Sequence, residues 1–277
     1  WKLIKNLPKM ITAILDEKKI VNSWIKKHGI DGIISDNRLG VFSRRIPSVF
    51  MTHQLNVMTG NTTWFTSKCH QYIIKKYTEC WVPDTNGEIN LTGDLGHLKD
   101  NNLNLKYIGP LSRMKKKETP IVYDLMIILS GPEPQRTFLD QKLQKEVANY
   151  KGKVVFVQGI VEKVQNKWQA GNVTYYNFMN SKQLEQTFNE SEFVLCRSGY
   201  TTVMDLAKLG KKAFFIPTPG QYEQEYLAIK LQNENLVPYA MQYDFTIEDL
   251  SKVKSFKGLS QFKNDIDWDA LFSVFED

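Results

Sequence analysis

Short apolar runs alternate with amphipathic stretches along most of the chain. The runs predicted as strands lie at residues 30–35, 47–51, 80–84, 107–110, 121–129, 154–157, 173–178, 193–196 and 213–216. The helical patterns between the later runs lie at 135–150, 201–209 and 222–232. Continuously apolar strands spaced by helices are typical of a parallel sheet covered on both faces. The pattern therefore predicts an α/β fold.

The first residues form an amphipathic pattern of their own. Apolar positions repeat at helical spacing over residues 7–25, and His28-Gly29 is a typical helix end. An α/β domain that opens on a helix is expected to have lost its first strand, and with it a phosphate-binding or catalytic loop. The alternative is a processed start at Trp1 with nothing missing.

A charged segment divides the pattern into two parts. Residues 112–119 include Lys115-Lys116-Lys117 and are closed by Pro120, which is a composition typical of a linker. A length of 277 residues also suits two domains. We expect an N-terminal domain over 1–114 and a C-terminal domain over 115–277, whose amphipathic tail at 268–275 packs back on a domain surface.

Composition narrows the class of protein. A hydrophobic fraction of 42% and a charged fraction of 24% exclude a disordered chain, and no run of 18 apolar residues exists that could span a membrane. Three cysteines without CxxC spacing argue against a disulfide framework or a zinc site. The formal net charge of +6 permits a phosphate-bearing ligand or an anionic lipid and does not demand nucleic acid.

Two predicted strands end in turns that run directly into helices. In an open parallel sheet, ligands bind beyond the carboxyl ends of the strands. A helix N-terminus there offers free N–H groups and the positive end of a dipole, which suits phosphate. The turn at 130–136 ends in Arg136 and the turn at 197–199 begins with Arg197, and arginine can bind phosphate with paired donors. The two turns and their arginines together predict a site for a phosphate ester. The alternative is that the glycines are present only because the turns require their backbone conformation.

A longer motif follows the second turn. Residues 196–207 read Cys-Arg-Ser-Gly-Tyr-Thr-Thr-Val-Met-Asp-Leu-Ala, and residues 215–228 read Phe-Ile-Pro-Thr-Pro-Gly-Gln-Tyr-Glu-Gln-Glu-Tyr-Leu-Ala. This pair resembles the nucleotide-sugar domain of glycosyltransferase family 28. The family has an Arg-Ser-Gly turn, an acidic residue in the next helix, and a glutamine pair before a tyrosine after the next strand. Weaker similarities lie at 109–113, 130–136 and 178–180, so the resemblance covers most of residues 28–240.

The resemblance implies a fold and an activity. The fold would be GT-B-like, with two Rossmann-like parallel-sheet domains facing each other across a cleft, the N-terminal one incomplete and on the acceptor side. The activity would be inverting, metal-independent transfer of a sugar, with N-acetylhexosamine expected, from a UDP-sugar donor to a saccharide or lipid-linked acceptor. The implied place is the cytoplasm at the inner face of the membrane, in the synthesis of a cell envelope polysaccharide. No cofactor and no nucleic-acid partner are expected.

The resemblance also implies donor-site residues, which share positions in turns or helix starts beyond the predicted strands. They are Arg113, Ser130, Gly131, Gln135, Arg136, Phe178, Met179, Arg197, Ser198, Gly199, Thr201, Thr202, Asp205, Gln224 and Glu225. The N–H groups of 130–135 and 198–202 would hold the diphosphate, and the three arginines would relieve its charge. Asp205 would accept ribose hydroxyls, and Gln224 and Glu225 would bond sugar hydroxyls. The turn of Phe178 and Met179 would hold the uracil edge.

Each of these roles has a structural alternative. Asp205 could offset a helix dipole, Gln224 and Glu225 could lie on a solvated helix face, and Met179 could be a core residue. The chain also departs from the family pattern. Prolines at 132 and 134 leave fewer free N–H groups in the first turn, and Glu225 replaces the second glutamine, which bears on the sugar accepted.

The catalytic base is the weakest part of the pattern. In the family a histidine lies in a first glycine-rich loop that these residues lack, and the base is expected there. Within the chain, His53 follows a predicted strand and could serve as a neutral imidazole, or it could be structural, while His97 in a loop has less support. The two Asp-x-Asp sequences at 265–269 are expected to cap the terminal helix rather than to bind metal.

Two rival functions remain open on the sequence. One is a UDP-sugar epimerase of the same fold, and the other is a non-catalytic nucleotide-sugar-binding subunit. Basic residues of the first segment could contact a membrane surface or an anionic lipid acceptor, or they could form a solvated face. They are Lys18, Lys19, Lys26, Lys27, Arg44 and Arg45.

Overall fold

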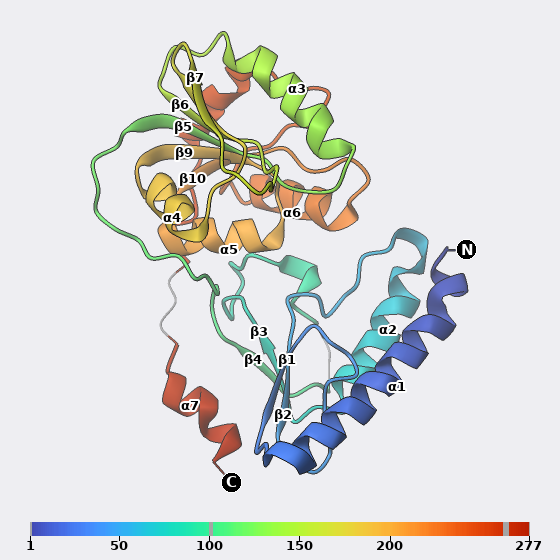
Figure 1. The fold of residues 1–277 in the computed structure, drawn as a ribbon. Coiled ribbons are helices and arrows are strands. Elements are labelled where there is room, and N and C mark those ends of the chain that lie inside the picture. The colour runs from blue at the N-terminus through green and yellow to red at the C-terminus, as the bar shows by residue number, and fades with distance from the viewer. Residues whose placement is uncertain (1, 100–101, 263–265, 277) are drawn as a thin grey trace. The chain divides into compact units, whose positions relative to one another are not determined.

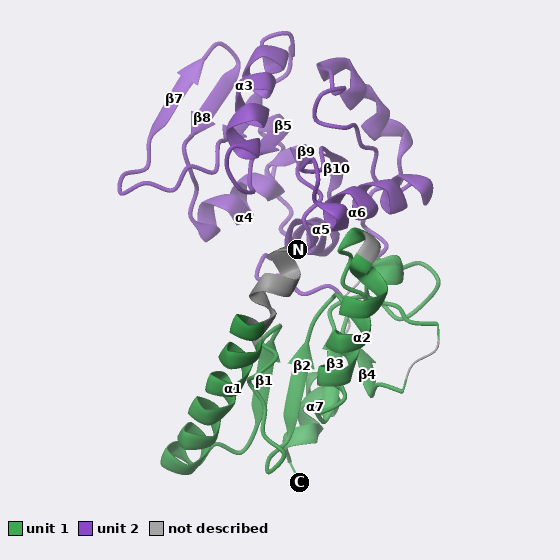
Figure 2. Ribbon diagram, turned by 90° about the vertical axis from the view of Figure 1, so that its right-hand side faces the viewer, with its two compact units in different colours: residues 1–109, 265–277 green, residues 110–264 purple. Residues whose placement is uncertain are grey.

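The chain folds into two compact units, each with its own sheet. The computed structural model describes residues 2–99, 102–262 and 266–276. Unit 1 comprises residues 1–109 and 265–277, and unit 2 comprises residues 110–264 (Figure 2). The division thus follows Gly109, rather than residue 114 as the sequence predicts. The reason is that residues 112–117 bond into unit 2: Ser112 to Asp205, Lys115 N–H to Glu185, and Lys117 N–H to Asn189.

Unit 1 is a four-stranded parallel sheet with helices on both faces. Its order is β1-β2-β3-β4, formed by Ile33–Asp36, Ser48–Met51, Glu79–Val82 and Leu105–Tyr107. Helices α1 (Lys2–His28) and α2 (Thr63–Ile74) lie on one face, and α7 (Trp268–Phe272) lies on the other (Figure 1). The short helices η1 (Gly60–Thr62), η2 (Gly93–Leu95) and η4 (Ser273–Phe275) complete the unit.

The alternation of side chains along β3 explains why both faces are covered. Cys80 and Val82 point into a core with Phe50, Ile74 and other apolar residues, while the buried Trp81 lies on the opposite face. The ring of Trp81 meets Phe272 at 5.6 Å between ring centroids, and it also packs edge-on against Phe275. The C-terminal segment therefore belongs to unit 1, although it follows unit 2 in the chain.

Unit 2 is a six-stranded sheet in the order β10-β9-β5-β6-β8-β7, parallel except for β7. These strands are Lys212–Phe215, Ser191–Cys196, Tyr123–Ile128, Val154–Val157, Val173–Tyr176 and Lys167–Ala170. The helices are α3 (Gln135–Val147), α4 (Ser181–Asn189), α5 (Tyr200–Leu209), α6 (Tyr222–Asn233) and η3 (Ile247–Ser255). The α/β class with parallel sheets is thus confirmed.

The register of unit 2 brings its strand ends together. Ile128 pairs with Val157 on one side and with Cys196 on the other, and Cys196 pairs with Phe215. Strands β5, β6, β9 and β10 therefore finish at one level, and the loops that follow them share one edge. A continuous core beneath them, with Leu125 and Phe156 fully buried, fixes that edge.

Several elements differ from the sequence prediction. Helices α2 and η3 form where no element is expected. Helix α1 begins at Lys2, before the apolar pattern starts, and includes Pro8. Strand β7 falls where no element is expected, since all four of its residues are exposed and an edge strand with both faces in solvent carries no apolar alternation.

Candidate functional site

The site predicted in unit 2 lies on the shared edge of β5, β6, β9 and β10. The turn at 130–134 follows β5, the turn at 197–199 follows β9, and the turn at 216–221 follows β10. Gly131 adopts a positive φ of 105°, and a Cβ there would lie 3.6 Å from Thr218 Oγ1. The first and third of these turns therefore face each other.

The N-terminus of α5 has no side-chain cap. Gly199 is the residue that begins the helix and offers no side chain to its first N–H groups. A Cβ placed on Gly199 would have only Gln224 Nε2 nearby, at 4.0 Å. Ser198 is buried and its hydroxyl donates to the carbonyl of Gln224 at 2.7 Å. Thr201 is exposed and Thr202 half-buried, so the start of α5 is an open position for an anion.

The N-terminus of α3 is different, because the side chain of Glu133 in the preceding turn caps it. Glu133 accepts the N–H of Thr137 at 3.2 Å, and its other oxygen pairs with the Arg136 guanidinium. Arg136 also donates to the carbonyl of Gln158 at 3.2 Å. The sequence predicts a phosphate cradle here, but a carboxylate already occupies part of it. Ser130 and Gly131 are exposed and Gln135 is half-buried at the same turn.

Asp205 lies on α5 and is joined to the segment that begins unit 2. Ser112 Oγ donates to Asp205 Oδ1 at 2.6 Å, and Arg113 is close enough to act on the charge of the carboxylate. Burial raises the pKa of Asp205, and the Ser112 bond and the Arg113 charge offset only part of that rise. The structure therefore brings together Arg113 and Asp205, which the sequence predicted separately.

Gln224 and Glu225 both bond to the turn that precedes α6. Gln224 Oε1 accepts the N–H of Thr218 at 2.9 Å, and its Nε2 donates to Gln221 at 2.6 Å. Glu225 Oε1 accepts the N–H of Gly220 at 2.8 Å. These bonds hold both side chains beside the turn rather than out in solvent. The hydroxyl of Thr218 is buried and lacks a partner within the described part of the chain.

Arg197 requires a correction to the predicted phosphate contact. Its side chain is 1% exposed, so it does not reach a ligand on the surface of the edge. Nη1 donates to the carbonyls of Ile216 and Pro217 at 3.1 and 3.0 Å. Nη2 donates to the Gln135 carbonyl at 3.0 Å and to Gln242 Oε1 at 2.7 Å. Burial lowers the pKa of the guanidinium to about 10, which leaves it charged at neutral pH. Its place is beneath the loops, which it joins.

The turn after β8 offers backbone groups at one residue. The carbonyl of Phe178 accepts from Gln165 at 2.6 Å and its N–H donates to Asn177 at 3.0 Å. Met179 has its sulfur in the core, where the Thr187 hydroxyl lies 3.5 Å away. Its N–H and carbonyl have no bond within the described residues. The side chain thus fits the core alternative, while the backbone remains available to a planar base.

The candidate base, His53, lies in unit 1 and is half-buried after β2. Sequence reasoning gave less weight to the group beside it. His97 Nε2 lies 3.2 Å from the carboxylate of Asp84, which is fully buried. The position of Asp84 directly after an apolar strand, followed within one loop by a histidine, is the signal that could have drawn attention to the pair.

The capping expected of the Asp-x-Asp sequences is seen at Asp267, the residue that the two sequences share. Asp267 accepts the N–H of Ala270 at 3.0 Å and caps α7, while Asp265 lies outside the described residues. In the described ranges, no group of three or more His, Cys, Asp or Glu side chains could hold a metal ion.

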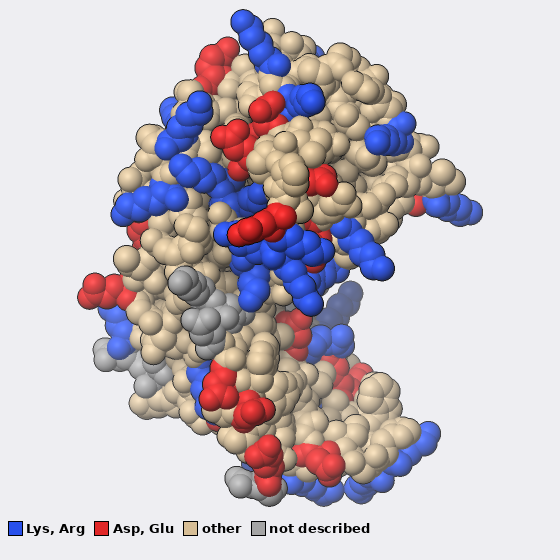
Figure 3. Space-filling model, turned by 90° about the vertical axis from the view of Figure 1, so that its left-hand side faces the viewer, with Lys and Arg blue, Asp and Glu red and all other residues tan. Residues whose placement is uncertain are grey.

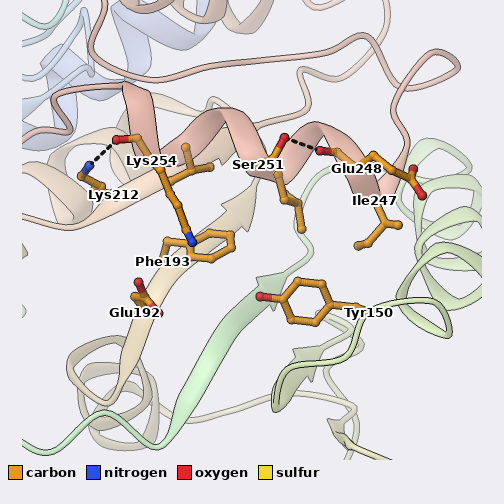
Figure 4. A pocket seen from close by; sticks show the side chains of 10 residues that line it. Tyr150, Glu192, Phe193, Lys212, Ile247, Glu248, Ser251 and Lys254 are labelled. Atoms are coloured by element: carbon orange, nitrogen blue, oxygen red, sulfur yellow. Dashed lines mark hydrogen bonds between the residues drawn. The ribbon is translucent and has the colours of Figure 1, made fainter.

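A cavity of about 590 Å³ lies elsewhere in unit 2 (Figure 4). Tyr150, Phe193 and Ile247 face it, and the Lys212 ammonium bonds to the Lys254 carbonyl at its rim. Its lining includes the first residues of β9 and β10, so it opens at the amino ends of the strands. None of the predicted donor-site residues lines it.

Comparisons with known proteins bear on the same parts of the chain. Residues 135–255 match the family model of the glycosyltransferase family 28 C-terminal domain. The chain is 25% identical over 260 residues to the UDP-N-acetylglucosamine--N-acetylmuramyl-(pentapeptide) pyrophosphoryl-undecaprenol N-acetylglucosamine transferase of Haemophilus ducreyi, covering 91% of this chain and 70% of that protein. It is 24% identical to the transferase of the same name from Buchnera aphidicola, covering 88% and 67%.

Solved structures agree at the level of the fold. MurG of Acinetobacter baumannii aligns with a TM-score of 0.58 at 11% identity, over 97% of this chain and 78% of that one. The calicheamicin glycosyltransferase CalG4 aligns with a TM-score of 0.60 at 11% identity, over 94% and 76%. A putative UDP-N-acetylglucosamine 2-epimerase from Listeria monocytogenes aligns with a TM-score of 0.58 at 9% identity, over 95% of this chain and 79% of that one. Identities this low compare folds and do not choose between transferase and epimerase chemistry.

Proposed function

We propose that the chain, whose residues 135–255 match the model of the glycosyltransferase family 28 C-terminal domain, transfers N-acetylglucosamine, or a closely similar N-acetylhexosamine, from a UDP-sugar. The observation that carries the proposal is the uncapped N-terminus of α5, with Asp205 on the same helix and Gln224 beside Gly199. Relatives along 91% and 88% of the chain are named as transferases of this sugar.

The donor is proposed to lie along the start of α5. The diphosphate accepts hydrogen bonds from the first N–H groups of the helix, at Thr201 and Thr202, where the dipole also favours negative charge. The ribose then meets the carboxylate of Asp205, which keeps Oδ2 free of the Ser112 bond. The uracil edge pairs with the backbone of Met179. The sugar lies over Gln224 and Glu225, whose amide and carboxylate groups match paired hydroxyls.

Transfer is proposed to invert the anomeric centre in one displacement. The acceptor oxygen attacks the anomeric carbon as its proton passes to a base, and UDP leaves with the bonding electron pair. The α5 N–H groups stabilise the charge that develops on the leaving diphosphate. This is the contribution that a divalent cation makes in metal-dependent transferases, so we propose a metal-independent reaction.

The acceptor is proposed to be lipid-linked, with unit 1 in contact with a membrane surface. Ile11, Leu15 and Trp24 on α1 are more than half exposed. Trp64 on α2 is 73% exposed, and the two helices share a face of unit 1 (Figure 2). Basic side chains lie nearby: a hollow of about 310 Å³ is lined in part by Lys18, Lys26, Arg44 and Arg45. Exposed apolar side chains together with basic side chains on one unit suit an anionic lipid surface.

No described helix is long and apolar enough to cross a bilayer, so the contact proposed is peripheral. On the side of unit 2 seen in Figure 3, Lys and Arg are interspersed with Asp and Glu. Lys115 and Lys117 in this unit both act on the charge of Glu185. Such mixed charge is typical of a solvated surface rather than of a nucleic-acid-binding stripe.

Calorimetry with UDP and with UDP-N-acetylglucosamine tests the donor site. We expect both to bind, and Gly199→Ala to weaken the affinity at least tenfold, because the new methyl group enters the space beside Gln224 that the diphosphate requires. Gly171→Ala is the matched control, since a Cβ there meets nothing within 4 Å and the turn joins β7 to β8. Absence of UDP binding, or equal affinity of the Gly199→Ala variant, would refute this donor site.

Product analysis then separates the three functions. Transfer yields UDP and a new glycoside on the lipid-linked muramyl pentapeptide named for the relatives. An epimerase instead returns an altered sugar without glycoside, and a binding subunit returns the donor unchanged.

A further inference from the structure

Gln242 lies at the shared edge of unit 2, in a segment that belongs to no named strand. Tyr239 pairs with Phe215 at the end of β10 in the parallel direction, and the N–H of Ala240 donates to the Phe215 carbonyl at 3.1 Å. The segment therefore runs beside β10 and carries Gln242 beyond the carboxyl end of that strand. The side chain is 2% exposed, so neighbouring protein groups must satisfy its amide.

The charge of Arg197 fixes the orientation of the Gln242 amide. A guanidinium only donates hydrogen bonds, so the amide oxygen of Gln242 must face Nη2 of Arg197, which lies 2.7 Å away. The amide nitrogen then points the other way and donates to Oε1 of Gln135 at 3.2 Å. The reverse orientation would set N–H groups against N–H groups, so the buried cation selects one of the two.

The same argument fixes the amide of Gln135. Because Nε2 of Gln242 is a donor, Gln135 must offer its oxygen to that neighbour and direct its own Nε2 elsewhere. Nε2 of Gln135 has no hydrogen-bond partner within the described residues, and this atom is not buried. Gln135 therefore presents N–H groups, rather than an oxygen, to the solvent.

The three side chains form a chain of hydrogen bonds that all run in one direction. Arg197 stays charged at neutral pH, because burial lowers its pKa only to about 10. Each bond in such a chain polarises the next, and a charged donor makes the strongest bond. The N–H groups of Gln135 are therefore better donors to an anion than those of an amide whose oxygen is unpaired.

Gln135 is close to the turn that precedes α5, where the donor diphosphate is proposed to bind. Arg197 begins that turn, and its Nη2 also donates to the carbonyl of Gln135 at 3.0 Å. The length of one arginine side chain thus separates Gln135 from the turn. At the start of α3 the N–H of Thr137 is already bonded to Glu133, so the Gln135 amide is a donor that this helix start still offers to an anion.

We propose that Gln242 is a positioning residue of the donor site, which relays the orientation set by Arg197 to Gln135, and that the amide of Gln135 donates to the diphosphate bound at α5. The proposal rests on the UDP-sugar function proposed above and adds a contact from the loop after β5. The diphosphate offers acceptor oxygens, so N–H groups bind it and an outward amide oxygen would repel it. Gln242 acts on the anion only through Gln135.

The first test is Gln135→Glu, which keeps the shape and still accepts from Gln242 but replaces the outward N–H groups by a carboxylate oxygen. We expect the affinity for UDP, measured by calorimetry, to fall by about tenfold or more. The affinity for uridine, which has no phosphate, should stay within about twofold, since no charged contact is lost. Gln141→Glu is the matched control, because Gln141 is exposed on α3 and the variant has the same net charge; it should bind UDP as the wild type does.

The second test is a double-mutant cycle with Gln242→Met, which keeps a long side chain but leaves the Gln135 amide without its partner. We expect this change to weaken UDP binding about threefold in the wild-type background and to have almost no effect in the Gln135→Glu background. A merely structural loss would weaken binding equally in both backgrounds, and that result would overturn the role of Gln242.

UDP affinity of Gln135→Glu within about twofold of wild type, or an equal loss for UDP and uridine, would overturn the contact with the diphosphate. NMR of the wild-type chain tests the same contact if Gln135→Glu fails to fold. The side-chain amide signals of Gln135 should shift at saturating UDP, and unchanged signals would overturn the proposal. Failure of the proposed function looks different, because the wild-type chain would then not bind UDP at all.

Discussion

Arg197 is the largest side chain among those that are fully buried in the described structure. We predict that replacing it destabilises unit 2. The change is Arg197→Met, which keeps most of the length of the side chain and removes every donor. Four acceptors lose their partner: the carbonyls of Ile216, Pro217 and Gln135, and the amide oxygen of Gln242.

The magnitude follows from which acceptors water can reach. Gln135 is half-buried, so its carbonyl can be rehydrated at little cost. Ile216 and Gln242 are 0% and 2% exposed, and Pro217 is buried. An unsatisfied buried acceptor costs about 1–3 kcal/mol. Against this, the variant no longer buries a guanidinium, whose desolvation penalty is several kcal/mol. The three buried acceptors together cost about 3–9 kcal/mol, and the relieved desolvation of the guanidinium offsets part of this, so the net loss expected is about 3–5 kcal/mol.

Urea unfolding monitored for unit 2 measures the effect. With a urea m-value of about 2 kcal/mol/M, the midpoint should fall by about 2 M without a change in slope. Arg113→Met is the control, since Arg113 is exposed and should alter the free energy of unfolding by less than about 0.5 kcal/mol.

A midpoint for Arg197→Met within about 0.5 M of wild type would refute the reasoning. It would mean that the loops of unit 2 do not depend on the buried cation. A folded, fully stable variant that lost UDP binding would instead restore the direct phosphate contact that the sequence predicted for Arg197.

Three further predictions concern other parts of the chain. The pKa of Asp84 in the folded chain lies below its unfolded value of about 3.9. Its stabilisation of unit 1 is therefore present above about pH 3.9 and is lost as the pH falls through the folded pKa. Asp84→Asn should reduce this loss of unfolding free energy at acid pH, as measured by denaturation at a series of pH values. Gly159→Ala should destabilise unit 2 by about 3 kcal/mol, and Gly171→Ala by about 1 kcal/mol. Both glycines have positive φ, but only at Gly159 would the new Cβ lie 2.3 Å from a carbonyl oxygen, that of Leu129. Binding of UDP-N-acetylglucosamine should weaken, and should release protons, as the pH falls through the raised pKa of Asp205. The reason is that ribose hydroxyls donate hydrogen bonds to the ionised carboxylate rather than to the protonated form. Calorimetry in two buffers should show this proton release with the wild-type chain and not with Asp205→Asn.

The strands that could be predicted from the sequence are those whose burial requires a run of apolar residues. The apolar runs that became β5, β6, β9 and β10 are buried on both faces, so their composition alone distinguishes them from helices. Strand β7 has no such apolar run, since its Lys-Trp-Gln-Ala sequence is exposed throughout. The place of the C-terminal segment was equally hidden, because the packing of Phe272 on Trp81 joins residues almost 200 positions apart.

The candidate site was predictable as a set of loops and less so as a set of contacts. The turns around Ser198 and Gln224 were found from the motif, and the register of β9 and β10 does bring them together. The depth of Arg197 could not be predicted, because an arginine beside a glycine turn is usually at the surface. The capping of α3 by Glu133 was also missed, since it depends on a rotamer of a residue between two prolines.

The burial of Arg197 and the capping of α3 by Glu133 both bear on where the proposed donor diphosphate would bind. Glu133 places a negative charge at the start of α3, which opposes a second anion there, whereas the start of α5 carries no such group. Arg197 directly precedes that start in the chain, and its charge is satisfied only by neutral oxygens in the described residues. A buried cation without a carboxylate partner leaves a positive potential around it. The same side chain that holds the loops after β5 and β10 would therefore also favour the anion proposed at α5, without touching it.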